Sequence, residues 1–202
     1  MGQHVHKLIQ DGIRKGMDYA GYISMMNDLV DKGKATGTEQ NEERIANTKL
    51  NAHRLRRIEK TMTVPEEKLE VFQKIPENQI WLVVLESWCS DGAQAVPLLH
   101  KIAKASSKIE LRLVLKDENP RLMDYFLTNG TRSIPKLIVT NEVGEVLCEW
   151  GPRPRTASKM VTEYKKRNKK VDDRIKKELQ MWYHRDGGNS MLDELIEIVK
   201  PH

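Results

Sequence analysis

The segment Ile80-Trp81-Leu82-Val83-Val84-Leu85-Glu86-Ser87-Trp88-Cys89-Ser90-Asp91-Gly92 decides the fold. Its apolar first half is typical of a strand covered on both faces, and a helix is predicted directly after the turn at Trp88 and Cys89. A thiol at a helix N-terminus faces unpaired backbone N–H groups and the positive end of the helix dipole, which favour a thiolate. Gly92 lies three residues after Cys89, so no second cysteine closes a C-x-x-C pair. The segment therefore indicates a redox-type scaffold that lacks half of the usual chemistry.

Composition indicates one sizeable core, or one core with large additions. The chain has 202 residues, 31% of them charged, and a mean hydropathy of −0.61. No stretch approaches the roughly 18 apolar residues of a membrane span. Residues 1–6 lack the basic and apolar segments of a secretory signal. Two cysteines are too few for a disulfide framework and suit a reducing compartment, so a cytoplasmic protein with no membrane partner is predicted.

The net charge of +5 is unevenly distributed along the chain. Residues 153–185 carry 12 Lys and Arg against 4 Asp and Glu, and the remainder of the chain is slightly acidic. The densest part, Tyr164-Lys165-Lys166-Arg167-Asn168-Lys169-Lys170, would suit phosphate groups. Acidic residues surround it and no nucleic-acid motif accompanies it, so a solvated helix is favoured over nucleic-acid binding.

Helical periodicity dominates residues 1–75. Apolar residues recur every three or four positions from Ile9 to Val30, and a second helix is predicted over 39–60. Thr63-Val64-Pro65-Glu66 has the form of a capping box, which predicts a short third helix to about residue 75.

From residue 76 the pattern alternates between strands and helices. Strands are predicted over 80–85, 109–115, 136–140 and 145–150, and helices over 93–106 and about 119–129. Two more helices follow, over about 156–183, with a bend near 169–171, and over 190–200. One parallel crossover followed by an antiparallel hairpin accounts for this order. We predict an α/β fold: a four-stranded mixed sheet flanked by helices over 76–167, with helical extensions over 1–75 and 168–202.

This order and three landmarks resemble the thioredoxin fold over residues 76–167. Trp88-Cys89 resembles the active-site motif of that family, and Asp117-Glu118-Asn119-Pro120 resembles the loop before its next helix. Ser133-Ile134-Pro135 matches the segment where the family carries a cis-proline facing the cysteine. More narrowly, the segments at 86–89, 129–136 and 150–154 resemble a bacterial group of thioredoxin-like proteins. The resemblance implies a site with Cys89 as its catalytic residue and with a supporting groove formed by Glu86, Trp88, Ser90, Asp91, Gly92, Ile134 and Pro135.

Two departures from the thioredoxin pattern concern its chemistry. In thioredoxins a second cysteine attacks the mixed disulfide and releases the reduced product, which Gly92 cannot do. Those proteins also bury an acid six residues before the first cysteine, where this chain has Val83. The loss of both groups is coherent and argues against ordinary dithiol reductase turnover.

Each residue near Cys89 has a functional and a structural interpretation. Cys89 is either a nucleophile with a lowered pKa or an inert cysteine at a turn, and Asp91 opposes the lowering through like-charge repulsion. Glu86 is either a base near the thiol or a carboxylate that faces solvent. Trp88 either shields the thiol or simply packs, and Pro135 either shapes the groove or is an ordinary turn proline.

Further candidates lie along the rest of the chain. Arg132, Arg153 and Arg155 are candidates for one edge of the groove, where they would attract an acidic peptide or a carboxylate-bearing thiol. Cys148 is interpreted as a small core residue, because another strand is expected to separate it from Cys89. The six histidines show no metal-ligand spacing, so neither a metal nor another cofactor is predicted.

Two functions remain open. The first is a monothiol thiol-disulfide oxidoreductase, in which Cys89 attacks a disulfide and a low-molecular-weight thiol resolves the mixed disulfide. The second is a non-catalytic interaction module that keeps the thioredoxin groove for a protein partner. The apolar helix faces of the extensions would also allow a homodimer.

Overall fold

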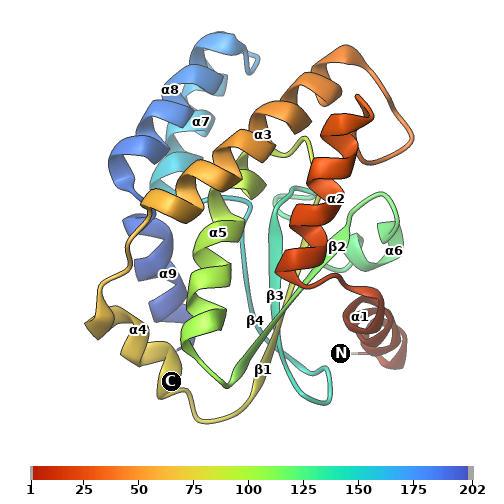
Figure 1. The fold of residues 1–202 in the computed structure, drawn as a ribbon, viewed down its shortest axis with the longest axis vertical. Coiled ribbons are helices and arrows are strands. Elements are labelled where there is room, and N and C mark those ends of the chain that lie inside the picture. Colours follow the sequence, from red (N-terminus) through yellow and green to blue (C-terminus); the bar gives the residue numbers. More distant parts are fainter. Residues whose placement is uncertain (1, 200–202) are drawn as a thin grey trace.

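The apolar run before Cys89 forms a central strand of a four-stranded sheet in a computed structural model that describes residues 2–199. Its strands are β1 (Gln79–Leu85), β2 (Ile109–Leu115), β3 (Lys136–Asn141) and β4 (Val146–Trp150). Its helices are α1 (Gln3–Lys15), α2 (Tyr19–Asp31), α3 (Glu42–Thr61), α4 (Glu66–Gln73), α5 (Ser90–Ala105), α6 (Pro120–Met123), α7 (Arg155–Asn168), α8 (Asp173–Asp186) and α9 (Asn189–Val199). Figure 1 shows these elements around the sheet.

The sheet is mixed, with the strand order β2-β1-β3-β4. Val83 of β1 lies opposite Leu113 of the parallel strand β2 and opposite Leu137 of the antiparallel strand β3. The strands β3 and β4 form an antiparallel hairpin. The predicted α/β fold with a four-stranded mixed sheet and flanking helices is therefore confirmed. Every residue of β1 is buried, as expected of a strand covered on both faces.

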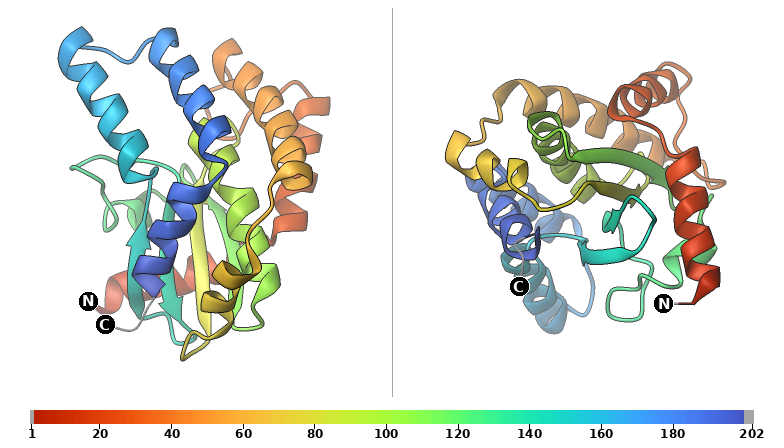
Figure 2. Two further views of the ribbon diagram at one scale, coloured as in Figure 1. Left: turned by 90° about the vertical axis from the view of Figure 1, so that its left-hand side faces the viewer. Right: turned by 90° about the horizontal axis from the view of Figure 1, so that it is seen from below.

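Alternate residues of β1 enter two separate cores. Trp81, Val83 and Leu85 pack in the larger core, with side chains from α2, α3, α4, α5 and α9. Leu82 and Val84 point to the other face, which α1 and α6 cover. Figure 2 shows these two groups of helices on opposite sides of the sheet. Helices α1 and α9 thus contribute to the cores on the two faces of the sheet. Within residues 2–199 no helix is long and apolar enough to cross a membrane.

The first helical stretch is divided at residues 16–18, although its apolar spacing continues through the break. Asp18 caps α2 by accepting a hydrogen bond from the N–H of Gly21 at 2.7 Å. Met17 forms a bridge with Leu113, so the chain turns to follow the sheet edge. At Gly16 a Cβ atom would lie only 3.0 Å from Cβ of Arg112, which explains a glycine at this crossing.

Two predicted helices are wrong in extent. The helix predicted from Asn119 to about residue 129 ends at Met123, and the Asn119 side chain forms no capping bond at its start. The helix predicted over 156–183, with a bend near 169–171, is divided into two helices at that place, since Lys169 adopts a left-handed conformation (φ 61°) and ends α7. The Asp172 carboxylate then accepts hydrogen bonds from the N–H groups of Arg174 and Ile175 and starts α8.

Candidate functional site

Cys89 lies at the carboxyl end of β1, where it is the N-cap residue of α5. Its Sγ accepts a hydrogen bond from the backbone N–H of Gly92 at 3.3 Å and donates one to the carbonyl oxygen of Ile134 at 3.4 Å. The peptide bond between Ile134 and Pro135 is cis. The fold therefore brings Cys89, Gly92 and the segment around Pro135 together, although 45 residues separate Cys89 from Ile134.

The thiol of Cys89 is buried, with only 7% of the residue exposed. Burial, followed by the negative charge of Asp91, raises its pKa to about 12. The N–H of Gly92 and the charge of Arg153 favour the thiolate, but their effect is smaller. The sequence left the sign of this pKa shift open, and in the folded chain it is upward. Cys89 is therefore a protonated thiol at neutral pH.

Asp91 links the site to the C-terminal helices. Its Oδ2 accepts hydrogen bonds from the guanidinium of Arg153, which follows β4, and its Oδ1 accepts one from the hydroxyl of Tyr183 in α8 at 2.8 Å. All three side chains are at least partly buried. Arg153 thus lies beside the site, but its charge is paired with Asp91 and is not free to attract an acidic peptide.

Two cations lie close to the ring of Trp88. The guanidinium of Arg44 lies 4.4 Å from the centroid of the Trp88 ring, and Nζ of Lys116 lies 5.2 Å from it. Its indole N–H is buried with no hydrogen-bond partner among residues 2–199. The ring is therefore held between helix α3 and the loop after β2. Arg44 was not predicted to contact this site, because most of α3, all of α4 and β1 separate it from Trp88 along the chain.

Glu86 is fully buried and does not face solvent, so that structural interpretation is wrong. Its Oε1 accepts a hydrogen bond from the backbone N–H of Asp117 at 2.8 Å. Its Oε2 has no partner within the described chain. Burial raises the pKa of this carboxyl group. Glu86 therefore ties the end of β1 to the loop after β2, and it makes no hydrogen bond to the thiol within residues 2–199.

A buried polar cluster around Ser87 was missed by the sequence analysis. The Ser87 hydroxyl lies 2.8 Å from that of Thr48 and accepts a hydrogen bond from the N–H of Thr36 at 2.9 Å. The Ser87 carbonyl accepts a hydrogen bond from the side chain of Asn51 at 2.9 Å. Isolated Thr and Asn residues in a helical pattern give no signal for such a cluster. It fixes α3 and the loop before it against the turn that carries Cys89.

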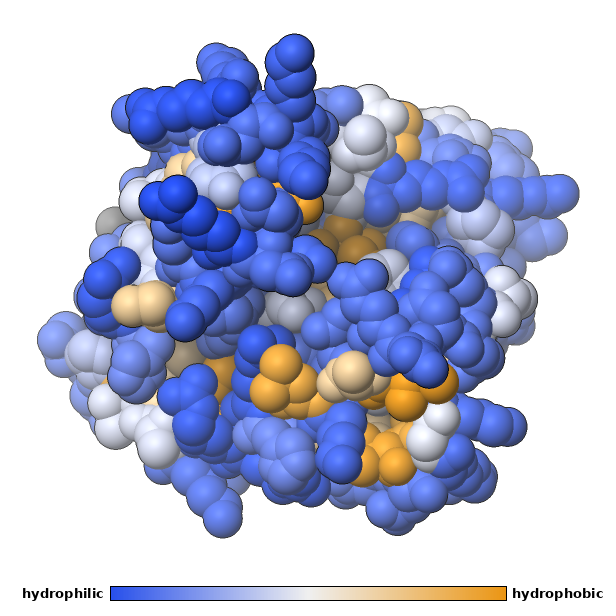
Figure 3. All heavy atoms as spheres, turned by 90° about the horizontal axis from the view of Figure 1, so that it is seen from above, coloured by the Kyte–Doolittle hydropathy of each residue, from blue (hydrophilic) through white to orange (hydrophobic). Residues whose placement is uncertain are grey.

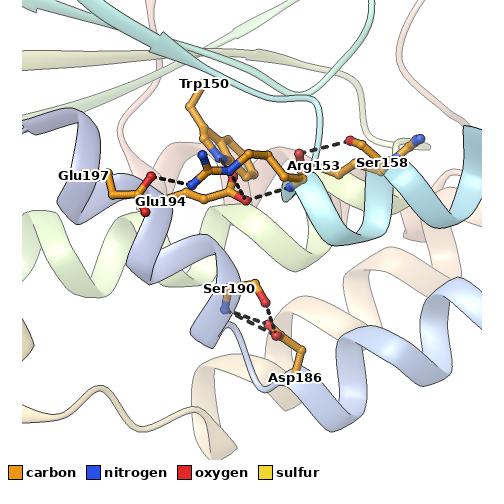
Figure 4. Close-up of polar contacts among 8 residues, drawn as sticks. Trp150, Arg153, Ser158, Asp186, Ser190, Glu194 and Glu197 are labelled. Atoms are coloured by element: carbon orange, nitrogen blue, oxygen red, sulfur yellow. Dashed lines mark hydrogen bonds and ion pairs between the residues drawn. The ribbon is translucent and has the colours of Figure 1, made fainter.

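The other basic candidates are engaged elsewhere. Arg132 pairs with Asp124 at 2.6 Å. The guanidinium of Arg155 pairs with Glu197, and the backbone N–H of Arg155 donates a hydrogen bond to the Glu194 carboxylate at 2.7 Å. The Glu194 carboxylate also accepts a hydrogen bond from the indole of Trp150 at 2.8 Å (Figure 4). The contacts of Arg155 and Trp150 with Glu194 and Glu197 hold α9 against the end of β4. Since Arg132 and Arg155 are both paired, they do not form a free cationic edge to the groove.

Cys148 lies in β4, and β3 separates that strand from β1, as expected. It is a free cysteine, half-buried, and burial raises its pKa to about 11. It packs against the larger core, in agreement with its interpretation as a small apolar residue. Within residues 2–199 no three His, Cys, Asp or Glu side chains come together in a cluster that could hold a metal ion.

A sheet whose central strand delivers Trp-Cys to a helix N-terminus, opposite a cis-proline, defines the thioredoxin-like class of proteins. The chain belongs to the thioredoxin family, since a family model described as thioredoxin matches residues 37–165. None of the curated proteins matches the chain.

Two solved structures share its fold. A protein of unknown function from Pseudomonas aeruginosa is 18% identical, with a TM-score of 0.57 and 93% of each chain covered. An HIV epitope scaffold is 16% identical, with a TM-score of 0.60, and the match covers 94% of this chain and 96% of the scaffold. At these identities the likeness concerns the fold alone.

Proposed function

We propose that this protein is a non-catalytic binding module built on the thioredoxin fold. The burial of Cys89, which raises its pKa to about 12, is the observation that carries the proposal. With this pKa only about one molecule in 10⁵ carries a thiolate at pH 7, and the thiolate is the nucleophile. A disulfide substrate would also need access to a sulfur that the folded chain covers.

Two further features support binding without redox turnover. Gly92 replaces the resolving cysteine and Val83 replaces the buried acid, so two groups of the dithiol mechanism are missing from the sequence. Asp91 adds a negative charge next to the thiol, which disfavours its ionisation.

A monothiol oxidoreductase is the second candidate, and the hydrogen bond from Gly92 N–H to Sγ favours it. In this reaction the Cys89 thiolate would attack a substrate disulfide, form a mixed disulfide and release one substrate thiolate. The thiolate of a low-molecular-weight thiol would then attack the substrate sulfur of the mixed disulfide, which releases the Cys89 thiolate and leaves this thiol in a disulfide with the substrate. This route needs a transient opening that exposes and deprotonates Cys89.

The rate of alkylation of Cys89 as a function of pH separates the two candidates. The measurement uses iodoacetamide on the Cys148→Ser variant, so that Cys89 is the only thiol. We expect slow alkylation of the folded protein, with a rate that still rises above pH 10, and a midpoint of about 8.5 in denaturant. A plateau in the folded protein below pH 8.5 would favour the monothiol reaction and contradict the binding module.

A further inference from the structure

A cavity of about 550 Å³ lies between α3 and α8, next to the first turn of α5. The helices α3, α7 and α8 rise past the carboxyl end of β1 (Figure 1). Figure 3 shows this end of the molecule as largely hydrophilic, with hydrophobic surface confined to separate patches and a hollow. The cavity thus lies between α3, which falls within the matched residues 37–165, and α8, which follows them.

Apolar side chains line much of this cavity, and two of them are unusually exposed. Leu50 in α3 and Val171 before α8 are each 46% exposed, and both line the cavity. Val161, Ile175 and Leu179 complete its apolar wall. Burial of apolar surface is favourable by about 25 cal/mol per Å², so an apolar group placed here would gain from covering Leu50 and Val171.

Among the described residues, one half-buried cation of the cavity has no carboxylate partner. Arg54, half-buried, donates hydrogen bonds from Nη1 to Oδ1 of Asn51 at 2.9 Å and to Oγ of Ser90 at 3.2 Å, and both acceptors are neutral. Among residues 2–199, no carboxylate oxygen lies within 4.0 Å of its guanidinium. Burial and the nearby charge of Arg57 lower the pKa of Arg54, and the charge of Asp91 offsets part of this lowering.

Most of the other charges at the cavity are paired, and Lys177 lines it as an exposed side chain. Lys176 of α8 pairs with Glu43 of α3 at 2.9 Å, which bridges the two helices. Arg153 pairs with Asp91, and both carboxylate oxygens of Asp91 accept hydrogen bonds, from Arg153 and Tyr183. Of the two lining cations without a carboxylate, Arg54 is half-buried and Lys177 is exposed, so an anion that entered the cavity would be attracted more strongly by Arg54.

We propose that this cavity binds a small amphipathic monocarboxylate, with its carboxylate on Arg54 and its apolar tail over Leu50 and Val171. The charge of Arg54, next to Ser90 at the start of α5, and the apolar wall match the two parts of such a ligand. A volume of about 550 Å³ lies within the usual range of small-molecule sites, about 300–1,000 Å³. The assignment rests on the proposed function, because it names the ligand class that the binding module would take.

Titration calorimetry with decanoate tests the assignment. We expect saturable binding of decanoate to the full chain, and much weaker binding of decyltrimethylammonium, which has the same tail and the opposite charge. Arg54→Gln should weaken decanoate binding at least about tenfold, since it removes a charged hydrogen-bond partner. Arg56→Gln, on the exposed side of the same helix, is the matched control and should bind as the wild type does.

A second pair of variants tests the apolar wall. Leu50→Gln should weaken decanoate binding about fivefold through lost apolar burial. Leu147→Gln, at a comparably exposed position of β4, should have no effect. Because both leucines are exposed, circular dichroism should show both variants folded.

Three results would overturn the assignment: no binding of decanoate, equal binding by the Arg54 and Arg56 variants, or equally tight binding of decyltrimethylammonium. Binding of an acidic peptide without decanoate would also overturn it, because the ligand would then be a polypeptide. These outcomes are separate from the alkylation profile of Cys89, which alone decides between the binding module and the monothiol enzyme.

Discussion

Two opposing effects act on the sulfur of Cys89, and their magnitudes decide its chemistry. A favourable charge at a helix terminus contributes typically 0.3–1 kcal/mol, as an order of magnitude, which lowers a pKa by less than about one. A pKa of about 12, compared with the usual 8.5 or so, corresponds to about 4–5 kcal/mol in favour of the neutral thiol. Burial therefore outweighs the helix terminus, and a cysteine at an N-cap position is not by itself reactive.

Glu86 provides a second test at the residue scale. Because burial raises its pKa in the folded state, the unfolded chain loses this proton first as the pH rises above about 4.3. Stability should then fall through the window between the unfolded and the folded pKa. We expect Glu86→Gln to remove this part of the pH dependence in urea unfolding measured from pH 4 to 8. Glu77→Gln, at an exposed site, is the control, and equal slopes in the two variants would contradict the assignment.

Gly92 retains the geometry of a disulfide site. A Cβ atom at this position would lie 3.5 Å from Cβ of Cys89, within the range of about 3.5–4.5 Å for disulfides, and 3.3 Å from Cδ1 of Leu85. We expect oxidised Gly92→Cys to contain a disulfide between Cys89 and the introduced thiol, detected as the loss of two thiols in a titration of the denatured protein. Gly92→Ala reports the effect of the added methyl group on stability. A folded Gly92→Cys variant that keeps both thiols under oxidising conditions would show that the turn has lost this geometry.

At the scale of elements, α8 is attached to the site through one hydrogen bond between buried groups. The hydroxyl of Tyr183 donates to the Asp91 carboxylate. Elsewhere along α8, Gln180 accepts a hydrogen bond from Gln94 of α5 and Lys176 pairs with Glu43 of α3. The Asp172 cap begins α8 and the left-handed Gly187 (φ 62°) ends it, so Tyr183 contacts Asp91 from within one continuous helix. The C-terminal helices therefore influence the surroundings of Cys89 even though they follow it by more than 80 residues in the sequence.

We expect Tyr183→Phe to lower the free energy of unfolding by about 1.5–3 kcal/mol, because it removes a hydrogen bond to a buried carboxylate. Tyr164→Phe is a matched control, since the Tyr164 hydroxyl also donates to a carboxylate, that of Asp172, at 2.9 Å but at the surface. Its effect should stay below about 0.5 kcal/mol. Denaturant unfolding of both variants measures the difference, and equal losses would contradict a buried role for Tyr183.

At the scale of the whole molecule, the helical extensions and the sheet share one large core. Tyr22 from α2, Leu195 from α9 and Trp81 from β1 belong to the same cluster of buried side chains. Polar contacts around Ser87 and Glu194 reinforce the attachment of the N-terminal and C-terminal helices. The additions are thus packed on the sheet and do not form separate cores among residues 2–199, apart from the small α7–α8 cluster.

We therefore expect a single cooperative unfolding transition in urea. Far-UV circular dichroism, which reports mainly the helices, and tryptophan fluorescence, which includes the buried Trp81, should give coincident curves. Loss of helical signal before the fluorescence transition would show that the extensions unfold independently of the sheet.

The fold could be read from the sequence because its signals are local. The apolar run of β1, the alternation of strands and helices and the landmarks at Cys89 and Pro135 depend on residues close together in the chain. Breaks between helices were less accessible: the apolar spacing runs through residues 16–18, and the division there depends on the pairing of Met17 with Leu113.

The character of the site depended on contacts that no local pattern encodes. The sequence determined that Cys89 stands at a helix start without a resolving cysteine. Only the tertiary structure decided that the thiol is buried, that Asp91 is held by Arg153 and Tyr183, and that Arg54 faces a cavity without an anionic partner. The physical reason is that solvation and charge pairing depend on distances in space, and packing brings together side chains that are 62 to 92 residues apart around Asp91.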